Sequence, residues 1–397
     1  MKNAGFLKRL LTSFNTKSSQ ASSLINLYSV GKPVWTPRNY ESLSTEGFTR
    51  NVIVYRCVNL IARSLASVPW SLFSGQSQLE THPLLSLLDR PNPNRGGAQF
   101  MEALVGYLLL SGNTYVEMVR SRSGKPLELY TLRPDRMRVI PSVSGVPIAY
   151  EYQVNGMTKR IAVNELNGRS SILHIKSFHP LNDWYGMSPI EAAAHSIDQY
   201  NAVGSHNLAM LQNGGRPSGA LVVGTKHTAK NLTPEQRETL RNDIQQMYEG
   251  SSNAGRVMVL EGDFDWKEMG LSPKDLDFID GKRLSAREIA QAYGVPPMLV
   301  GIQGDATYAN YKEARFHLWE DTILPLLDLI TDELNRWLTS CYEGTLKLSH
   351  DLDGIPALAP RRESAWKRVE SASFLTINEK RAAVGYGAIP SGDRLCS

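Results

Sequence analysis

Three carboxylates set one residue apart, Glu261, Asp263 and Asp265, are the residues of this sequence best placed to do chemistry. Clustered carboxylate oxygens bind divalent cations, and a bound cation could activate water against a phosphodiester. The same residues beside a short apolar run are also typical of the solvated edge of a hairpin. The sequence therefore leaves two interpretations of this cluster open, a cation site and a hairpin edge.

Other reactive combinations are incomplete. His174 and His179 have no second pair of metal ligands nearby, and we interpret them as strand-end residues. Pro134-Asp135 begins like a nuclease motif, but Glu151-Tyr152-Gln153 lacks the lysine that would stabilise the attacking water. Neither a phosphate-binding GxxxxGK[ST] loop nor a GxSxG nucleophile motif is present. The prediction is a protein that is not an enzyme and holds no metal or cofactor.

Composition indicates a packed protein of two or three modules. The chain has 397 residues, with 42% hydrophobic and 21% charged. No apolar run approaches the length of a membrane helix, so no membrane association is expected. The cysteines are odd in number and far apart in sequence, which argues against a disulfide framework and fits a reducing compartment: Cys57, Cys341 and Cys396.

The placement of charge says more than the net charge of +4. The first acidic residue is Glu41, and residues 1–45 are expected to form a flexible basic arm. The rest of the chain is close to neutral, which does not support a broad DNA-gripping surface. The basic residues that precede Glu41 are Lys2, Lys8, Arg9, Lys17, Lys32 and Arg38.

The first half of the chain predicts an α+β domain over residues 46–187. Apolar residues at helical spacing predict helices at 51–68 and 99–110. The period then changes to two, and Asn155-Gly156 is a strong hairpin signal because both residues tolerate positive φ. The predicted strands are 115–120, 127–132, 137–140, 150–154, 157–163 and 172–178.

From Ser188 onward long helices are expected. Ser188-Pro189-Ile190-Glu191 is a capping box that opens a helix over residues 188–213. A small strand–helix–strand–strand insert follows, then a helix at 273–293 and a loop. Pro325 lies within the next helix, 310–340, and should kink it because proline cannot donate to Asp321. A strand at 345–350 and a helical tail with a second capping box at Thr376 complete the chain.

Several stretches in this order resemble the portal protein of long-tailed double-stranded DNA bacteriophages. The resemblance also extends to the portals of gene transfer agents, which are domesticated phage-like particles. It runs from about residue 50 to the C-terminus. The matching stretches are "LRPDRMRV", "ILHIKSF", "YGMSPIEAA", "LQNGGRPSGAL", "NAGRVMVLEGDFDWKEMGLSPKDLDFID", "EIAQAYGVPPMLVG" and "NEKRAAVGYGAIPSGD".

The resemblance implies a dodecameric ring that replaces a capsomer of the major capsid protein at one vertex of a virion or phage-like particle, assembled in the bacterial cytoplasm. Double-stranded DNA would be packaged and ejected through its channel, with docking of the terminase large subunit and later of a head–tail adaptor and tail. By position, the implied parts are a wing (46–187 and 310–350), stem helices (188–213 and 271–294), a clip (214–270), a tunnel loop (295–309) and a crown (351–397).

The tunnel loop carries two interpretations. The loop could be buried at a subunit interface through its apolar residues 296–300, or its tip could line the channel, and both can hold for different halves. Glycines 294, 301 and 304 could serve as hinges. The channel-facing residues implied by the resemblance are Gly301, Gly304, Asp305, Ala306, Thr307 and Tyr308.

Two interpretations also remain open for each group of basic residues outside the tunnel loop. On the stem, Lys282, Arg283 and Arg287 could touch passing phosphates, or could pair with Asp277, Asp280 or Glu288. In the clip, a basic side could meet terminase or adaptor, or be a solvated helix face; its residues are Lys226, His227, Lys230, Arg237 and Arg241.

Two functions from other classes remain as alternatives. One is a metal-dependent nucleic-acid-modifying enzyme that uses the carboxylates at 261–265. The other is an oligomeric scaffold with no DNA in its channel.

Overall fold

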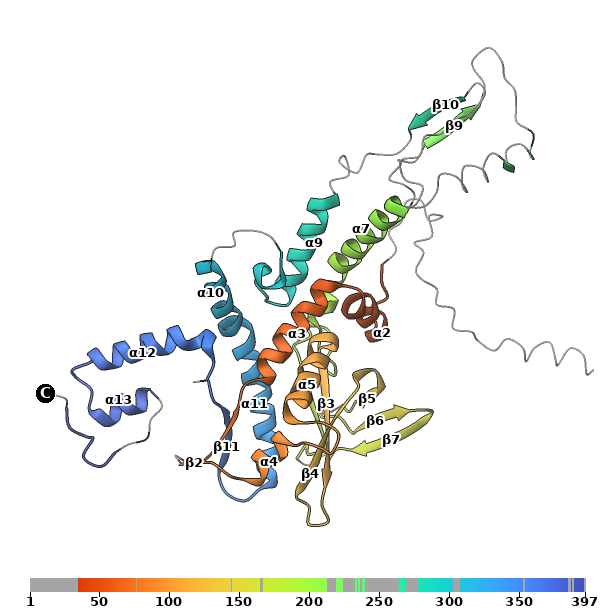
Figure 1. Ribbon diagram of the computed structural model, residues 1–397. Helices are drawn as coiled ribbons and strands as arrows, with labels where there is room; N and C mark the ends of the chain where they lie inside the picture. Colours follow the sequence, from red (N-terminus) through yellow and green to blue (C-terminus); the bar gives the residue numbers. More distant parts are fainter. Residues whose placement is uncertain are drawn as a thin grey trace, which may run out of the picture. The chain divides into compact units, whose positions relative to one another are not determined.

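The structure is a computed structural model of the chain (Figure 1). The chain separates into two compact units, Met1–Thr36 and Pro37–Ser397, and every element below belongs to the second. The residues described are 35–397 except 76, 144, 165–166, 213–218, 224–232, 234, 236–237, 240–263, 269–277, 303–307, 353, 385–386, 388 and 396–397.

Two apolar helices, α3 (Val52–Ala66) and α5 (Gly97–Ser111), pack against each other at the centre of the unit. The Asn51 side chain starts α3 by accepting hydrogen bonds from the amides of Ile53 and Val54. Helix α5 ends where Gly112 adopts a left-handed conformation, φ 70°. Both helices predicted from apolar spacing are confirmed, with bounds within two residues.

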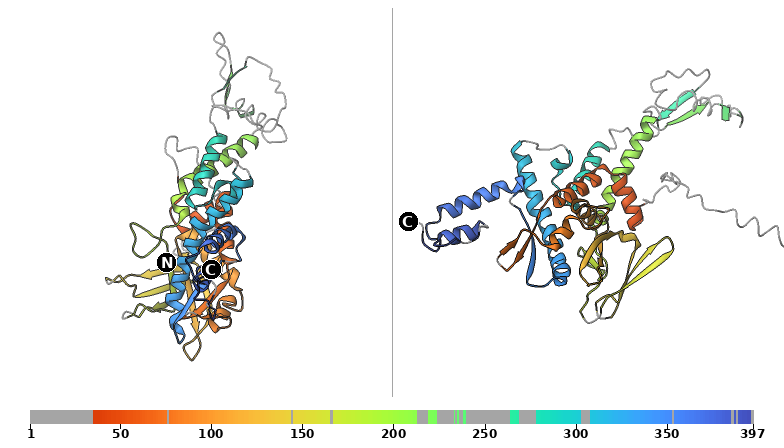
Figure 2. Two further views of the ribbon diagram at one scale, coloured as in Figure 1. Left: turned by 90° about the vertical axis from the view of Figure 1, so that its left-hand side faces the viewer. Right: turned by 60° about the horizontal axis from the view of Figure 1, so that its bottom comes forward.

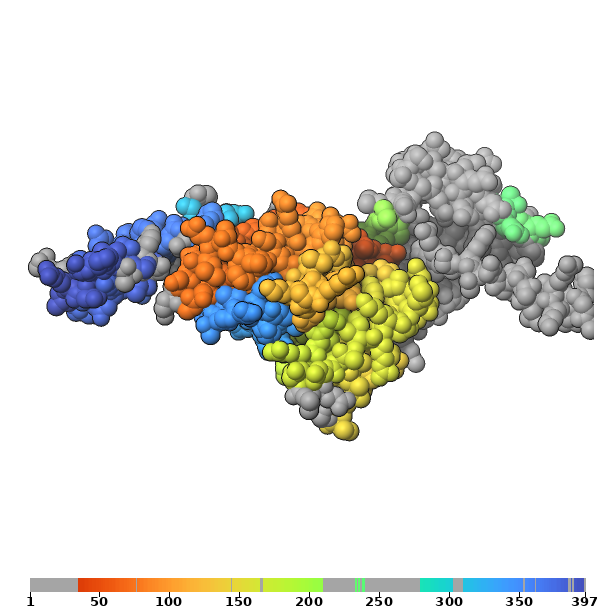
Figure 3. Space-filling model, turned by 90° about the horizontal axis from the view of Figure 1, so that it is seen from below, coloured from red at the N-terminus to blue at the C-terminus, as the bar shows by residue number. Residues whose placement is uncertain are grey.

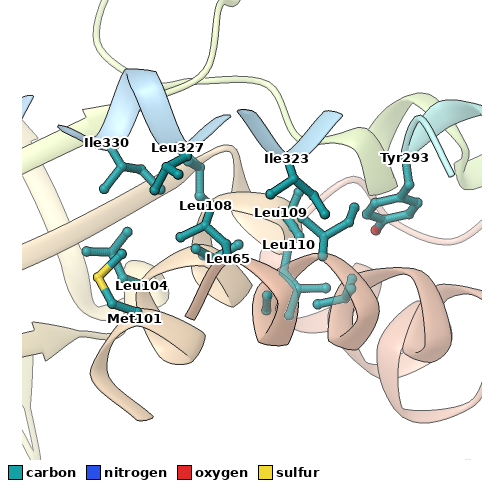
Figure 4. Packing of buried hydrophobic residues seen from close by; sticks show 14 of the residues in the cluster. Leu65, Met101, Leu104, Leu108, Leu109, Leu110, Tyr293, Ile323, Leu327 and Ile330 are labelled. Atoms are coloured by element: carbon teal, nitrogen blue, oxygen red, sulfur yellow. The ribbon is translucent and has the colours of Figure 1, made fainter. Parts of the chain in front are cut away.

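A continuous hydrophobic core joins these helices to the C-terminal half of the chain. Leu104 and Leu108 on α5 lie close to Leu65 of α3, and leucine and isoleucine side chains of a later helix cover them (Figure 4). The buried residues from that later helix are Ile323, Leu327 and Ile330. Elements more than two hundred residues apart therefore share one core.

Two three-stranded antiparallel sheets form the domain predicted for the period-two region. One has the order β4-β3-β8 and the other β5-β6-β7. In the second sheet Asn155 (φ 49°) and Gly156 (φ 79°) make the expected turn between β6 and β7. The strands are β3 (Asn113–Arg120), β4 (Pro126–Leu132), β5 (Met137–Ile140), β6 (Ala149–Val154), β7 (Met157–Ala162) and β8 (Ile172–Lys176).

The sequence predicted only one strand of a third sheet. Strand β1 (Trp70–Ser74) pairs with β2 (Ser77–Leu79) on one side and with β11 (Leu346–His350) on the other. Only the strand that became β11 was expected. The other two are short and lack regular alternation of buried and exposed residues. Among the described strands, β2 pairs only with its neighbour β1, whereas β1 also pairs with β11, far along the chain.

Regular structure begins earlier than the predicted end of the N-terminal arm at residue 45. Helix α2 (Tyr40–Leu43) and a π-helix, η1 (Ser44–Thr49), lead directly into Asn51. Gly47 lies against Ile190, where an added Cβ would come within 2.4 Å of the isoleucine side chain. Residues 40–45 therefore belong to the packed unit and not to the arm.

The long C-terminal helix is continuous but changes its hydrogen-bonding pattern. It consists of α10 (Tyr308–His317), the π-helix η5 (Leu318–Ile323) and α11 (Leu324–Leu338). Pro325 lies in the first turn of α11, where a missing backbone N–H is tolerated, because the wider π turn ends just before it. The kink expected at Pro325 stays a prediction, and the structure shows a π segment immediately upstream of this residue.

The end of the long helix is held by hydrogen bonds to a loop of the first half and to β11. The Trp337 Nε1–H donates to the carbonyl of Ser170 at 3.0 Å, and the Asn335 amide exchanges two 2.7 Å hydrogen bonds with the backbone of Leu348 in β11. The blue end of α11 accordingly lies between orange and yellow-green residues of the first half in Figure 3.

The tail contains two helices, α12 (Ala359–Ser371) and α13 (Ile377–Ala383). Thr376 and Glu379 make both hydrogen bonds of the predicted capping box at the start of α13. Short segments elsewhere are α4 (Pro83–Asp89) and the 3₁₀ turns η2 (Pro134–Arg136), η6 (Thr339–Cys341) and η7 (Pro356–Leu358).

Candidate functional site

The two predicted stem helices pack side by side as an antiparallel pair (Figure 2). The first is divided by Ala193 into α6 (Pro189–Ala192) and α7 (Ala194–Gln212), and the second is α9 (Phe278–Ala292). Ser196 donates to the Glu288 carboxylate at 2.7 Å, and Ser285 donates to Gln199 at 3.4 Å. The paired numbers run in opposite directions, which fixes the antiparallel arrangement.

The basic residues of α9 take part in contacts within the chain. Arg283 pairs with Asp280 at 3.3 Å, one turn earlier, and the Lys282 ammonium lies 4.7 Å from the centre of the Tyr200 ring. Both members of the Arg283–Asp280 pair are largely exposed. An exposed pair of this kind stabilises a helix by only about 0.3–0.5 kcal/mol. Such a pair can exchange for another anionic partner at little cost, so it does not decide between the two interpretations.

Helix α9 ends in a Schellman motif that turns the chain into the predicted tunnel loop. The amide of Val295 donates to the carbonyl of Ala290, and that of Gly294 donates to Gln291, both at 2.9 Å. Gly294 has φ 65°, and an added Cβ would come within 2.5 Å of Thr322 Oγ1. The Thr322 hydroxyl donates to the Gly294 carbonyl at 2.7 Å. Gly294 is therefore a closely packed helix cap fastened to the π segment.

The first half of the predicted loop packs on the core of its own chain. Residues Pro297–Val300 form a 3₁₀ turn, η4, which ends at Gly301 with φ 82°. Val295 and Leu299 are buried, and Met298 and Val300 pack against the core. This confirms the packing expected for residues 296–300, while a role at a subunit interface stays a prediction.

The tip of the loop lies outside the described residues, including Gly304, Asp305, Ala306 and Thr307. Gly301 ends η4, and Tyr308 begins α10. The clip residues Lys226, His227, Lys230, Arg237 and Arg241 also lie outside the described residues. In that segment the structure describes one antiparallel pair of strands, β9 (Gly219–Val223) with β10 (Phe264–Glu268).

Tyr293 anchors the end of α9 in the core, next to Ile323 (Figure 4). Burial raises the pKa of its phenol well above the usual value, and the neighbouring Cys57 adds to the rise. Burial likewise raises the pKa of the Cys57 thiol to about 12. The Tyr293 hydroxyl makes no hydrogen bond to the described residues, so the ring contributes by packing.

A polar network that was not predicted from the sequence connects β3 and β8 with the loop before α6. Asn113 Oδ1 accepts from the Gly186 amide at 2.8 Å and from His174 Nε2 at 3.0 Å. Its Nδ2 donates to the carbonyls of Ser111 and Gly186. Gly112 and Gly186 touch backbone to backbone, leaving no space for a Cβ at either. In the sequence, the glycines at 112 and 186 were the signal for this close backbone contact.

His174 lies in the middle of β8, and the interpretation as a strand-end residue was wrong. Its ring stacks on Tyr115 with centroids 4.2 Å apart and meets the edge of Tyr150. Burial lowers its pKa to about 3, with a smaller effect from Lys176. His174 is therefore a neutral structural residue beside a second core, a smaller hydrophobic cluster that includes Tyr115, Tyr150 and Ile172. His179 Nδ1 accepts from the Leu181 amide in the following loop.

The remaining reactive candidates do not assemble in the described part of the chain. Asp135 forms an ion pair with Arg133 at 2.8 Å. Glu261 and Asp263 lie outside the described residues, and Asp265 is on β10. Among the described residues no group of three or more His, Cys, Asp or Glu is placed to hold a metal, and no helix is long and apolar enough to span a bilayer.

Comparison with known proteins identifies the family of this chain. Residues 52–385 match the family described as phage portal protein. An uncharacterised protein of Rickettsia bellii is 43% identical over 88% of this chain and 90% of its own length. The portal protein of Enterobacteria phage HK97 is 26% identical over 89% of this chain and 82% of its own length.

Solved structures give the same result. A chain in the neck of an empty gene transfer agent (GTA) particle, computed with C6 symmetry, is 45% identical, with TM-score 0.71 over 90% of this chain and 96% of that one. A chain in the neck of a native GTA particle, computed with C12 symmetry, is 44% identical, with TM-score 0.68 over 91% and 97%. The chain therefore belongs to the phage portal protein family, a family of structural proteins and not of enzymes.

Proposed function

We propose that this chain forms a closed ring of twelve copies in the neck of a phage or gene transfer agent particle, at one vertex of the capsid. The observation that carries the proposal is the chain of the native particle's neck, computed with C12 symmetry, which is 44% identical over nearly the whole length of both chains. Identity at this level over both chains favours the same place in a particle.

In this proposal the ring encloses a channel for double-stranded DNA, bounded by the α7–α9 pairs and the loop tips. The α9 side chains Lys282, Arg283 and Arg287 meet phosphates transiently. A channel for movement must not hold DNA tightly, because each phosphate contact adds a salt-dependent attraction that every step must break. Arg283, an exposed cation that can exchange Asp280 for a phosphate, satisfies that requirement.

Docking partners follow from the same proposal. The terminase large subunit engages the clip, residues 214–270, during packaging, and a head–tail adaptor takes the same end afterwards. The major capsid protein surrounds the wing. The basic clip residues named above supply the contact for an acidic partner surface.

Negative-stain electron microscopy of the purified chain tests the ring. The expected result is closed rings with an axial hole wide enough for a DNA duplex. A persistent monomer at high concentration would contradict the proposal, and rings without an open axis would favour the scaffold without a DNA channel.

A loop exchange tests the role of the tip separately. Replacing Gly304–Thr307 by a Ser/Thr segment of equal length should leave rings intact but reduce DNA packaging or retention in assembled particles. The matched control is an equal-length replacement of the exposed turn 121–124 between β3 and β4, which should package normally. Normal packaging and retention by the loop variant would rule out the role of the tip.

A further inference from the structure

The loop between β8 and α6, residues 177–188, holds two apolar side chains almost fully in solvent. Phe178 is 85% exposed and Leu181 is 91% exposed. These residues lie directly before the first stem helix. Apolar side chains of this size are normally covered, and a pair exposed together on one short loop is typical of a contact site.

This β8–α6 loop is tightly braced. Asn182 Oδ1 accepts from the amides of Trp184 and Tyr185, and the Tyr185 hydroxyl accepts from the Val139 amide of β5. The Lys176 ammonium donates to the carbonyl of Asp183. Because the backbone is already fixed, presenting Phe178 and Leu181 to a partner costs little conformational entropy.

A second apolar surface lies at the start of α3. Phe48, Val52 and Tyr55 follow one another at helical spacing and form the α3 patch. Val52 is 60% exposed and Tyr55 is 49% exposed, and the rings of Phe48 and Tyr55 are 5.2 Å apart. The patch offers a shallow aromatic and aliphatic surface at the start of a well-capped helix.

The two surfaces carry opposite charges. Asp183 is exposed on the β8–α6 loop, and Arg56 is exposed next to Tyr55 on the α3 patch. Within the described part of the chain, neither side chain forms a hydrogen bond or ion pair. The loop surface, which is apolar with an acidic side chain beside it, therefore complements the α3 patch, which is apolar with a basic side chain beside it.

From these features we infer that the β8–α6 loop of one copy docks on the α3 patch of the next copy around the ring. This inference rests on the proposed ring. Identical subunits in a cyclic ring meet head to tail, so one chain must carry two different surfaces that complement each other. Phe178 and Leu181 act as the central anchors, Asp183 and Arg56 fix the register, and neighbouring surface supplies the remaining area of a stable interface.

Variants that disable one surface at a time test this directly. F178D/L181D removes the loop anchors, and V52D/Y55D removes the patch. Each variant alone should be monomeric by light scattering. An equimolar mixture should give heterodimers and nothing larger, because the intact loop of one variant fits the intact patch of the other. Formation of the heterodimer also shows that both variants are folded.

The heterodimer allows finer tests. Phe178→Ala in the chain with the intact loop should weaken the pair by at least about 30-fold, as expected for an interface anchor. Asp183→Lys in that chain should weaken the pair, and Arg56→Glu in the partner chain should restore it. Met157→Asp, at an exposed methionine of β7, is the control and should leave rings intact.

The inference is overturned if either double variant still forms rings, or if the mixture stays monomeric. A charge reversal that the second reversal does not rescue removes the assigned register. If the wild-type chain and the double variants all form rings, only this interface is rejected. A monomeric wild-type chain would instead reject the proposed function.

Discussion

Acidification should destabilise this protein through one histidine, His174. Its ring is stacked on Tyr115 and donates through Nε2 to Asn113, so protonation would put a charge into the second core. The folded-state pKa is about 3, below the ordinary 6.5. The unfolded chain therefore binds the extra proton between these values. The stabilisation is complete above pH 6.5 and is lost progressively as the pH falls towards 3.

The size of the effect follows from linkage. Between pH 7 and pH 5 the unfolded His174 takes up most of one proton and the folded one takes up almost none. The free energy of unfolding should therefore fall by about 2 kcal/mol from this residue. At pH 5 that figure depends on the unfolded pKa and hardly on the folded one, provided that the folded pKa stays below about 4.

Urea unfolding at fixed protein concentration, at pH 7 and pH 5, measures this contribution as the difference between wild type and His174→Gln. The variant loses the ring stacking and should be less stable at pH 7, but it should lack the titration. Wild type is expected to lose about 2 kcal/mol more than the variant over this range. Equal losses would refute the reasoning, as would an NMR titration in which the folded His174 ring protonates near pH 6.

Two further predictions concern the anchor of the loop. Gly294→Ala should lower the free energy of unfolding by about 2–3 kcal/mol, and with it the melting temperature, because alanine at φ 65° is strained and its Cβ meets Thr322. Gly281→Ala, in open space on the same helix, is the control and should raise the melting temperature slightly. Tyr293→Phe removes a buried hydroxyl without a partner among the described residues, so urea unfolding should show a change within about 1 kcal/mol; a loss of several kcal/mol would mean that the hydroxyl is hydrogen-bonded.

Much of the local structure could be predicted because the signals were local. Asn155-Gly156 made the turn between β6 and β7, and Thr376 made its capping box, since each depends only on residues within a few positions. The stem helix started at the predicted cap, Ser188, for the same reason. The match over residues 52–385 confirms the family resemblance, and the order of the parts that the resemblance implied stays a prediction.

Other features depend on contacts that no window of sequence contains. Strand β1 pairs along its full length with β11, and the π segment before Pro325 carries Thr322 to Gly294. Neither partner is near in sequence. The interpretation of His174 failed because its environment comes from Tyr115 and Asn113 on β3 and from Tyr150 on β6 of the other sheet.

The sequence by itself determined the caps, turns, helix bounds and family of this protein, because backbone preferences and motif order are properties of short stretches. Only the tertiary structure decided which glycines have no space for a side chain, which histidine is neutral, and that Phe178 and Leu181 are exposed to solvent on a braced loop. Burial and charge depend on what the folded chain brings close, and apolar residues in a sequence look alike whether the fold covers them or leaves them for a partner.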